Sequence, residues 1–301
     1  MNRKERVWAA INHQRTDYIP KGEILVAREL WEQSGSTGCN LGKKYNFFRE
    51  LGLDLVVIPL SWQEKEAQKA EIEWWSRKTD FFVFLLLNGG FQEACFQWGW
   101  QETLLATLNR PQELLKLMKE QVGANINLAL EALELGGDGI IIGEDIAYQK
   151  GTLISPKALG ELVFPNLAQI LKVFQGLGMP VFFHSDGNLQ AVLEEIVNLG
   201  FDGLQGIEPG AGMDLALVKQ KYGHRLCLMG NLDLGELGSN LEKNNRLAAL
   251  VEKTMREGSP GGGYIFGTAG GLGNNLALEQ IKYLYKLAAD FQQEDDRVLD
   301  N

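Results

Sequence analysis

The stretches Gly139-Ile-Ile-Ile-Gly-Glu-Asp145 and Pro180-Val-Phe-Phe-His-Ser-Asp186 decide the fold. Each is a short, uninterrupted apolar run that ends in polar residues, and such runs are typical of strands in a parallel sheet with both faces covered. The segment Pro156–Gln175 between them predicts a helix, because Ser155 suits the N-cap and Pro156 suits the first helical position. Strand, helix and strand together predict a βαβ unit.

The same alternation continues along the chain. Further apolar runs predict strands at Ile19–Ile24, Leu55–Leu60, Gly203–Glu208, Leu226–Asn231 and Tyr264–Thr268. Further helices are predicted at Asn188–Leu199, Met213–Tyr222, Leu241–Glu257 and Leu276–Phe291. With one more unit around Phe81–Trp100, about eight units fill the chain, as in a TIM barrel. We therefore expect residues 1–301 to form one (β/α)8 barrel, an α/β fold, with an N-terminal helical cap that closes its lower end.

The stretch Phe81–Trp100 is rich in phenylalanine and tryptophan around Asn88-Gly89. Asn-Gly between apolar runs is the signal for a hairpin with a primed turn. We interpret the stretch as strand three extended into an aromatic hairpin, or as an inserted hairpin. Its aromatic rings would either pack as plain core or form a wall beside a flat substrate.

Composition excludes several classes of protein. Apolar residues make up 45% and charged residues 23%, which is ordinary for a soluble globular protein. The formal charge of −10 opposes binding to nucleic acid or to an anionic membrane. The chain starts with charged residues and has no apolar stretch of about 20 residues, so we expect a cytoplasmic protein with no signal peptide. Cys39, Cys95 and Cys227 lie far apart, and we expect none of them to be catalytic or to bind metal.

Four consecutive predicted strands end in polar side chains, at the carboxyl ends where barrel strands converge. These side chains are Glu144, Asp145, His184, Asp186, Glu208, Asn231 and Asp233. Taken singly, each carboxylate could be a solvated loop residue or a helix cap, and His184 could be a core histidine. His184 and Asp186 are two residues apart in an extended segment, so their side chains point to the same side. That pair offers either two metal ligands or a histidine held by an acid.

Two glycine-rich segments flank the last predicted strand. Gly261-Gly-Gly263 precedes it and so lies at the wrong end of the barrel for the active site. Gly267-Thr-Ala-Gly-Gly-Leu-Gly273 follows it and could bind phosphate at a helix N-terminus, or simply leave space over the barrel mouth. Neither segment matches a phosphate-binding fingerprint.

Several blocks of sequence carry a resemblance to one superfamily. They are Arg6-Val-Trp-Ala-Ala-Ile-Asn-His-Gln-Arg-Thr-Asp-Tyr-Ile-Pro20, Leu153-Ile-Ser-Pro156, Phe164-Pro165, His184-Ser-Asp-Gly-Asn188, Glu208-Pro209, Gly212-Met-Asp214, Lys219, Tyr222-Gly223 and Gly230-Asn-Leu-Asp233. In order and spacing they resemble uroporphyrinogen decarboxylase and the related corrinoid-linked methyltransferases. The basic Arg-Gln-Ala-Gly-Arg motif of true decarboxylases is missing, and Lys21-Gly-Glu-Ile-Leu-Val-Ala-Arg28 stands in its place. The chain is therefore more similar to the methyltransferase and O-demethylase branch.

The resemblance implies a zinc site. Thiol-activating methyltransferases of the superfamily bind zinc through a His-x-Cys motif and a later cysteine. His184 matches the histidine, whereas Asp186 and the segment Ala269-Gly270 occupy the cysteine positions. A histidine with carboxylates makes a harder Lewis acid, suited to oxygen ligands. We expect zinc to be bound by His184, Asp186 and Glu208, with Glu144 as a further candidate.

The resemblance also implies a reaction. We expect metal-assisted methyl transfer from a small methylated substrate, methoxylated compounds first among them, to a corrinoid protein, as in O-demethylation. Asp186, Glu144 and Asn231 are the expected catalytic residues. The expected substrate contacts are Asp145, Tyr148, Trp98 and Asp233. The alternatives are decarboxylation in porphyrin biosynthesis, with Asp145 or Asp186 near the pyrrole nitrogens, and a non-catalytic barrel that has lost its metal site.

Overall fold

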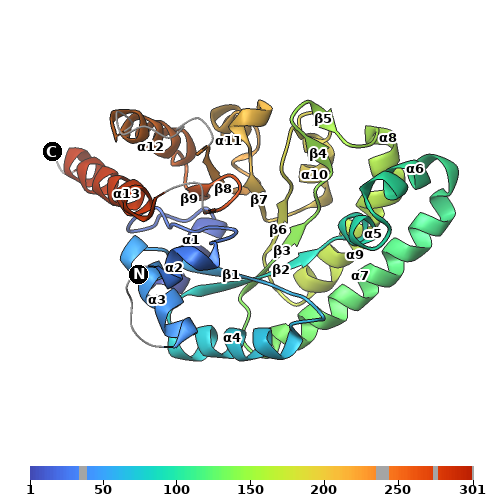
Figure 1. Cartoon of the computed structure of the whole chain (residues 1–301). Helices are drawn as coiled ribbons and strands as arrows, with labels where there is room; N and C mark the ends of the chain where they lie inside the picture. The colour runs from blue at the N-terminus through green and yellow to red at the C-terminus, as the bar shows by residue number, and fades with distance from the viewer. Residues whose placement is uncertain (34–38, 235–243, 274–276, 300–301) are drawn as a thin grey trace.

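The computed structural model describes residues 1–33, 39–234, 244–273 and 277–299. Its centre is a curled parallel sheet of seven strands in the order β1-β2-β3-β6-β7-β8-β9 (Figure 1). The strands are β1 (Leu55–Pro59), β2 (Phe82–Asn88), β3 (Gly139–Gly143), β6 (Val181–His184), β7 (Gly203–Gly206), β8 (Cys227–Leu232) and β9 (Tyr264–Thr268). The two short strands β4 (Ala147–Tyr148) and β5 (Gly151–Thr152) form a separate antiparallel pair. The fold is therefore α/β, and a parallel sheet is confirmed.

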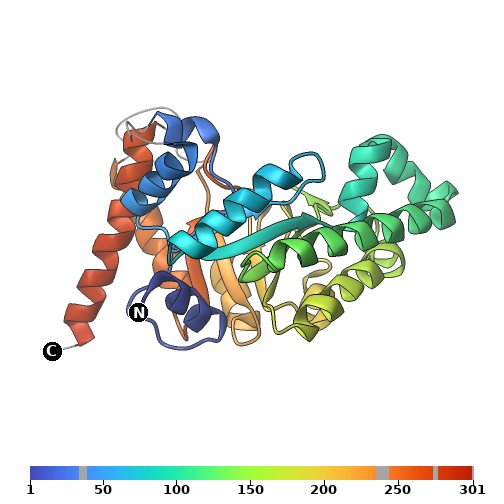
Figure 2. The same ribbon diagram turned by 90° about the horizontal axis from the view of Figure 1, so that it is seen from below.

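Most of the helices lie around the outside of the strands (Figure 1). Those before β3 are α1 (Arg3–Ile11), α2 (Arg28–Glu32), α3 (Asn40–Leu51), α4 (Lys65–Lys78), α5 (Gly90–Trp98), α6 (Trp100–Asn109) and α7 (Pro111–Leu133). Those after it are α8 (Pro156–Ala158), η1 (Leu159–Val163), α9 (Phe164–Gly176), α10 (Leu193–Leu199), η2 (Pro209–Ala211), α11 (Leu215–Tyr222), α12 (Asn244–Gly258) and α13 (Leu278–Leu299). In Figure 2, α5 and α6 project at one side of the molecule and α13 runs along the opposite side. None of the helices that the structure describes combines the length and apolar character needed to cross a bilayer.

The predicted first strand, Ile19–Ile24, forms bridges instead of a regular strand. The Gly22 amide donates to the Phe266 carbonyl at 2.9 Å, and the Phe266 amide donates to the Pro20 carbonyl at 2.8 Å. On its other side, the Lys21 carbonyl accepts the Asp54 amide just before β1, at 2.7 Å. The segment therefore lies between β9 and β1 and links the two edges of the sheet.

Helix α1 packs against the interior of the curled sheet. Val7, Ala10 and Ile11 join a buried cluster formed by inward side chains of the strands, which are Leu55, Val57, Phe82, Phe84, Ile141, Phe182, Cys227, Met229 and Ile265. The Lys4 amide donates to the carbonyl of Asp80, just before β2 begins, at 2.9 Å. Helix α1 thus covers the amino ends of the strands and leaves their carboxyl ends open for a site.

The prediction of an aromatic hairpin around Asn88-Gly89 is wrong. Strand β2 pairs in parallel with both β1 and β3, and Gly89 is the N-cap of α5. Asn88-Gly89 therefore starts a helix and does not turn the chain back. The physical reason is a long-range contact, because the Glu144 carboxylate accepts hydrogen bonds from the first-turn amides of this helix.

Other helix boundaries differ by a few residues from the expected ones. A π-helical turn, η1, interrupts Pro156–Gln175. The helix expected from Asn188 begins at Leu193, and the one expected from Met213 begins at Leu215 behind the capping side chain of Asp214. The predicted starts at Leu241 and Leu276 lie outside the described residues.

Candidate functional site at the strand carboxyl ends

Asp145, His184 and Asp186 gather at the carboxyl ends of β3 and β6. One potential ligand atom from each of the three lies within 4.8 Å of the others. The sheet register explains the grouping, since Gly143 pairs with His184 and side chains alternate between the two faces. Asp145 and Asp186, each two residues along from that pair, therefore share the face of His184. His184 Nε2 lies 3.9 Å from Asp145 Oδ1.

Hydrogen bonds to backbone amides fix the strand ends that carry the three side chains. Asp145 Oδ1 accepts the Asp186 amide at 3.1 Å, which ties the ends of the two strands together. Gln92 Oε1 accepts the Asp145 amide at 3.2 Å, and Ser185 Oγ accepts the Ile146 amide at 3.2 Å. His184 Nδ1 is buried and has no hydrogen-bond partner among the described residues. The strand ends that carry the group are therefore fixed, and His184 Nε2 is the nitrogen that faces Asp145.

The site concentrates negative charge. Burial raises the pKa of Asp186, the charges of Asp145 and Glu208 raise it further, and the neighbouring His184 opposes them. Holding several carboxylates close together at the edge of a pocket is unfavourable unless a proton or a cation offsets their repulsion. The arrangement is therefore chemically suited to bind a cation.

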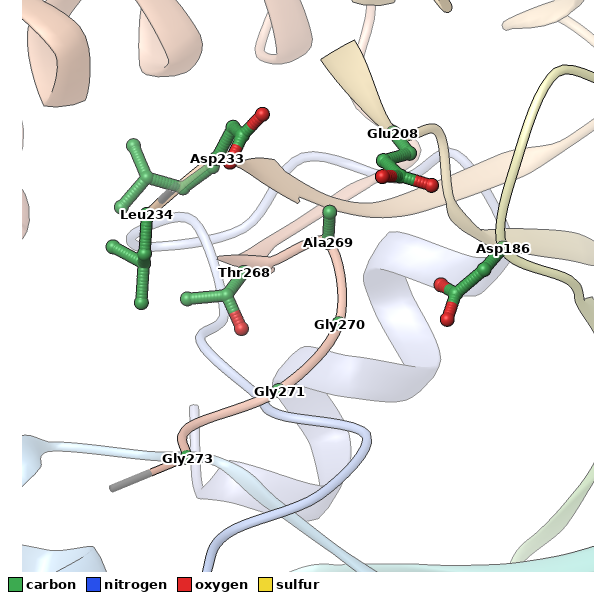
Figure 3. A pocket seen from close by; sticks show the side chains of 10 residues that line it. Asp186, Glu208, Asp233, Leu234, Thr268, Ala269, Gly270, Gly271 and Gly273 are labelled. Carbon is green, nitrogen blue, oxygen red and sulfur yellow. The ribbon is translucent and has the colours of Figure 1, made fainter. Parts of the chain in front are cut away.

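A pocket of about 400 Å³ opens beside this group. Figure 3 shows the Asp186 and Glu208 side chains on one side of it and the segment Thr268–Gly273 along another. Glu208 Oε2 accepts the Gly187 amide at 2.9 Å, which fixes this carboxylate at the pocket wall. The lining residues are Asp186, Glu208, Leu232, Asp233, Leu234, Thr268, Ala269, Gly270, Gly271 and Gly273, with no lysine or arginine among them.

Glu144 does not join the group. It is fully buried and lies on the opposite side of its strand end from Asp145, with Oε1 accepting the amides of Phe91 at 2.6 Å and Gln92 at 3.2 Å. Burial raises its pKa to about 8. A Cβ atom on Gly89 would lie 1.5 Å from Glu144 Oε2, so the carboxylate fills the space that a side chain of the N-cap would need. Glu144 therefore caps α5. It is not among the residues that line the pocket, so its expected catalytic role has no support from its position.

Asn231 and Asp233 have different surroundings. Asn231 is buried and its Nδ2 donates to the Ile207 carbonyl at 3.1 Å, so it supports the loop that carries Glu208. It faces a neighbouring cavity and not the pocket beside Asp186. Asp233 lines both cavities.

The expected aromatic contacts lie apart from the pocket. Tyr148 is half exposed on β4, and its backbone packs against Gly187. Trp98 ends α5 and packs under the guanidinium of Arg110, whose carbon lies 5.5 Å from the ring centre. Phe91 is fully buried. An aromatic wall for a flat substrate is therefore not formed by this cluster.

The cysteines are not part of the group formed by Asp145, His184 and Asp186. Cys39 is exposed, whereas Cys95 and Cys227 are buried. Burial raises the pKa of both buried thiols to about 12, so neither provides a thiolate near neutral pH.

Sequence reasoning missed Glu23, Gln205 and Thr268. Glu23 is an acidic residue within the apolar run Ile19–Ile24, and a charged residue in a predicted strand is the signal that could have identified it. Its carboxylate accepts the Thr268 amide at 3.0 Å and the Thr268 hydroxyl at 2.5 Å, directly behind the pocket wall. Gln205 Nε2 donates to the Ala269 carbonyl at 2.9 Å, while its Oε1 is buried without a partner among the described residues. Both side chains therefore support the pocket wall after β9.

Comparison with known proteins gives one family and a common fold. The sequence model described as uroporphyrinogen decarboxylase (URO-D) matches residues 90–291. The uroporphyrinogen decarboxylase of Coxiella burnetii (strain RSA 331 / Henzerling II) is 26% identical over 151 residues. That match covers 49% of this chain and 40% of the relative, so the chain spans less than half of the relative's length.

Two solved structures resemble the whole chain. A methyltransferase from Methanosarcina mazei has a TM-score of 0.78 at 17% identity, covering 97% of this chain and 99% of its own. A B12-independent methionine synthase from Shewanella sp. W3-18-1 has a TM-score of 0.62 at 14% identity, covering 94% and 97%. At these identities the likeness shows a shared fold.

Proposed function

The chain belongs to the uroporphyrinogen decarboxylase (URO-D) family, and from this premise we propose that it is a metal-dependent methyltransferase. The donor is a small methylated compound, with methoxylated compounds as the first class to test, and the acceptor is a corrinoid on a separate protein. The observation that carries the proposal is the group Asp145, His184 and Asp186 at the edge of an open pocket. The fold shared with the Methanosarcina mazei methyltransferase supports it.

The donor atoms fit a divalent cation such as zinc. One imidazole nitrogen and two carboxylates are common zinc ligands, and three protein ligands leave a coordination position open for substrate. His184 Nε2 lies 3.9 Å from Asp145 Oδ1, so this nitrogen faces the carboxylates, and the charges of Asp145 and Glu208 beside Asp186 favour a positive partner. Glu208, at the adjacent wall, is available as a further ligand. When bound, such a cation supplies Lewis acidity to an oxygen of the substrate.

The residues of the chain then define which substrates enter. Asp186, Glu208 and Asp233 face the pocket, so they disfavour anionic compounds. Leu232 and Leu234 provide the apolar contacts for a methyl-bearing end, and the glycines after Ala269 leave room for the compound. Glu23 and Gln205 hold the Thr268–Ala269 wall from behind and so keep the pocket open.

The charge of the pocket disfavours the decarboxylase alternative. A porphyrinogen with several carboxylates would meet three acids and no basic side chain among the lining residues. Like-charge contacts of this kind cost several kcal/mol. Metal analysis together with a methylation assay distinguishes the enzyme from a non-catalytic barrel.

The test combines metal analysis with a methylation assay. Metal content and zinc affinity are measured for the wild type, His184→Ala and Asp186→Asn, with Asp290→Asn on the exposed surface of α13 as the matched control. We expect each site variant to weaken zinc binding at least about tenfold and the control to leave it unchanged. Methylation of cob(I)alamin is then followed with a panel of methoxylated and other small methylated compounds, and should fall in the same variants.

Three results would contradict the proposal in different ways. Consumption of uroporphyrinogen by metal-free protein would establish decarboxylation. Absence of both metal and methyl transfer would indicate a non-catalytic barrel. Methyl transfer that persists in metal-free protein would retain the reaction but remove the metal from it.

A further inference from the structure

A second cavity lies at the opposite end of the barrel, near the amino ends of the strands. It measures about 350 Å³ and is formed by the segment after α1 and by the loop that leads into β9. Its lining residues are Ala10, His13, Gln14, Arg15, Thr16, Ile19, Ser259, Gly261, Gly262, Gly263 and Tyr264. The glycine run Gly261–Gly263, noted in the sequence, thus has a cavity of its own that is separate from the proposed methyltransferase site.

The charge of this cavity is opposite to that of the pocket at the other end. His13 and Arg15 line it, and its lining includes no carboxylate, although the chain as a whole carries a formal charge of −10. Arg15 forms no ion pair with any residue that the structure describes. Burial lowers the pKa of His13, and the nearby Lys219 lowers it further. The neighbourhood is therefore electropositive and holds an uncommitted guanidinium.

The three glycines bring the backbone close to His13. Their φ angles are 74°, 71° and 63°, a left-handed conformation that residues with a side chain rarely adopt. A Cβ atom on Gly263 would lie 2.2 Å from His13 Nδ1, so only glycine allows this approach. The loop therefore presents backbone, and not side chains, to the cavity.

Lys219 orients that backbone. Its ammonium group donates to the carbonyls of Gly262 and Gly263, and it is not among the residues that line the cavity. In a planar trans peptide the carbonyl and the following amide point in opposite directions, so the Gly263 amide points away from Lys219. Within the described residues, neither the Gly261 nor the Gly263 amide has a hydrogen-bond acceptor. These two donors are thus available to a ligand.

We propose that this cavity binds a small tetrahedral oxyanion, phosphate either free or as the terminal group of a small metabolite, through Arg15, His13 and the free glycine amides. Arginine and backbone amides are the donors that proteins commonly use for phosphate. The hydroxyls of Thr16 and Ser259 add further donors at the same cavity. The site is distinct from the proposed methyltransferase pocket and does not depend on it.

Histidine NMR signals of the full-length protein give a direct test, because the chain has three histidines, His13, His184 and His224. The His13 signal is assigned with His13→Gln. Sodium phosphate, glycerol phosphate and acetate are titrated in turn at constant ionic strength, with chloride as the reference. We expect a saturable shift of the His13 signal with both phosphates and a much weaker one with acetate. Glycerol phosphate binding more tightly than phosphate would identify a metabolite as the source.

Arg15→Gln should weaken phosphate binding at least about tenfold, the usual effect of losing a charge-assisted hydrogen bond. Arg77→Gln, on the exposed face of α4, is the matched control and should leave the affinity unchanged. Thermal unfolding without phosphate checks that both variants are folded. The proposal is overturned if the His13 signal shows no saturable shift, if Arg15→Gln binds phosphate like the wild type, or if phosphate moves the His184 signal instead.

Discussion

Replacing Glu23 by glutamine tests whether the wall behind the pocket contains a carboxyl group that titrates near neutrality. Glu23 is buried and accepts hydrogen bonds from the amide and hydroxyl of Thr268 and from the hydroxyl of Tyr285. Burial raises its pKa from an ordinary 4.5 to about 7, against the opposing effect of these hydrogen bonds. Between those two pH values the folded protein holds a proton that the unfolded chain has released.

The sign of the pH effect follows from this difference. The folded state is favoured by proton uptake, so the contribution is fully present below pH 4.5 and is lost as the pH rises through about 7. The two pKa values differ by about 2.5, and each pKa unit corresponds to about 1.4 kcal/mol, so the loss is at most about 3–4 kcal/mol. Glutamine resembles the protonated acid at every pH, so Glu23→Gln should remove this dependence.

Urea unfolding followed by circular dichroism between pH 5 and pH 8 measures the effect. The unfolding free energy of the wild type minus that of Glu23→Gln should fall by about 2 kcal/mol over this range. Tyr285→Phe is the matched control, because it removes a hydrogen bond that lowers the pKa of Glu23 and should move the transition to higher pH. A difference between wild type and Glu23→Gln that stays constant across the range would refute the reasoning.

The remaining predictions concern the unfolding free energy and the binding of metal at the proposed site. Asp54→Ala should lower the unfolding free energy by about 3 kcal/mol in urea, because Arg6 Nη1 lies 2.6 Å from the buried Asp54 Oδ1 and would lose its buried partner. Glu144→Ala should lower it by about 2–4 kcal/mol, because two helix amides lose their acceptor, yet zinc affinity should stay within about threefold. A loss of zinc without a loss of stability would contradict that assignment. Cys227→Ser should leave the metal content of the purified protein unchanged, as measured by elemental analysis.

The spacing of residues within one strand could be read from the sequence, but the register between strands could not. His184 and Asp186 are two residues apart, which is enough to place them on one face. Whether Glu144 or Asp145 joins them depends on how β3 pairs with β6, and a shift of one residue exchanges the two. The observed pairing of Gly143 with His184 selects Asp145. This explains why Asp145, which was expected to bind substrate, lies beside His184 and Asp186, whereas Glu144 does not.

The start of α5 shows a second limit of sequence reasoning. Asn88-Gly89 between apolar runs has the local pattern of a hairpin turn. The structure forms a helix there because Glu144, 53 residues from Phe91, supplies the acceptor for its first amides. No local pattern reports such a contact, and tertiary interactions regularly override short-range turn preferences. The strands, in contrast, were recognisable because their apolar runs are determined by burial on both faces.

The chemistry of the side chains limits which metal the proposed site would favour. Cys227 is the first residue of β8 and precedes Asn231, near its carboxyl end, by four residues, which is about 13 Å along a strand. Its thiol lies in the apolar interior beside residues of α1, so it cannot reach His184 and its neighbours. The group consequently offers nitrogen and oxygen ligands, which do not select zinc by softness as thiolates would. Zinc, cobalt and manganese should therefore be compared directly in the metal analysis, because the ion that supports the proposed methyl transfer need not be the one that binds most tightly.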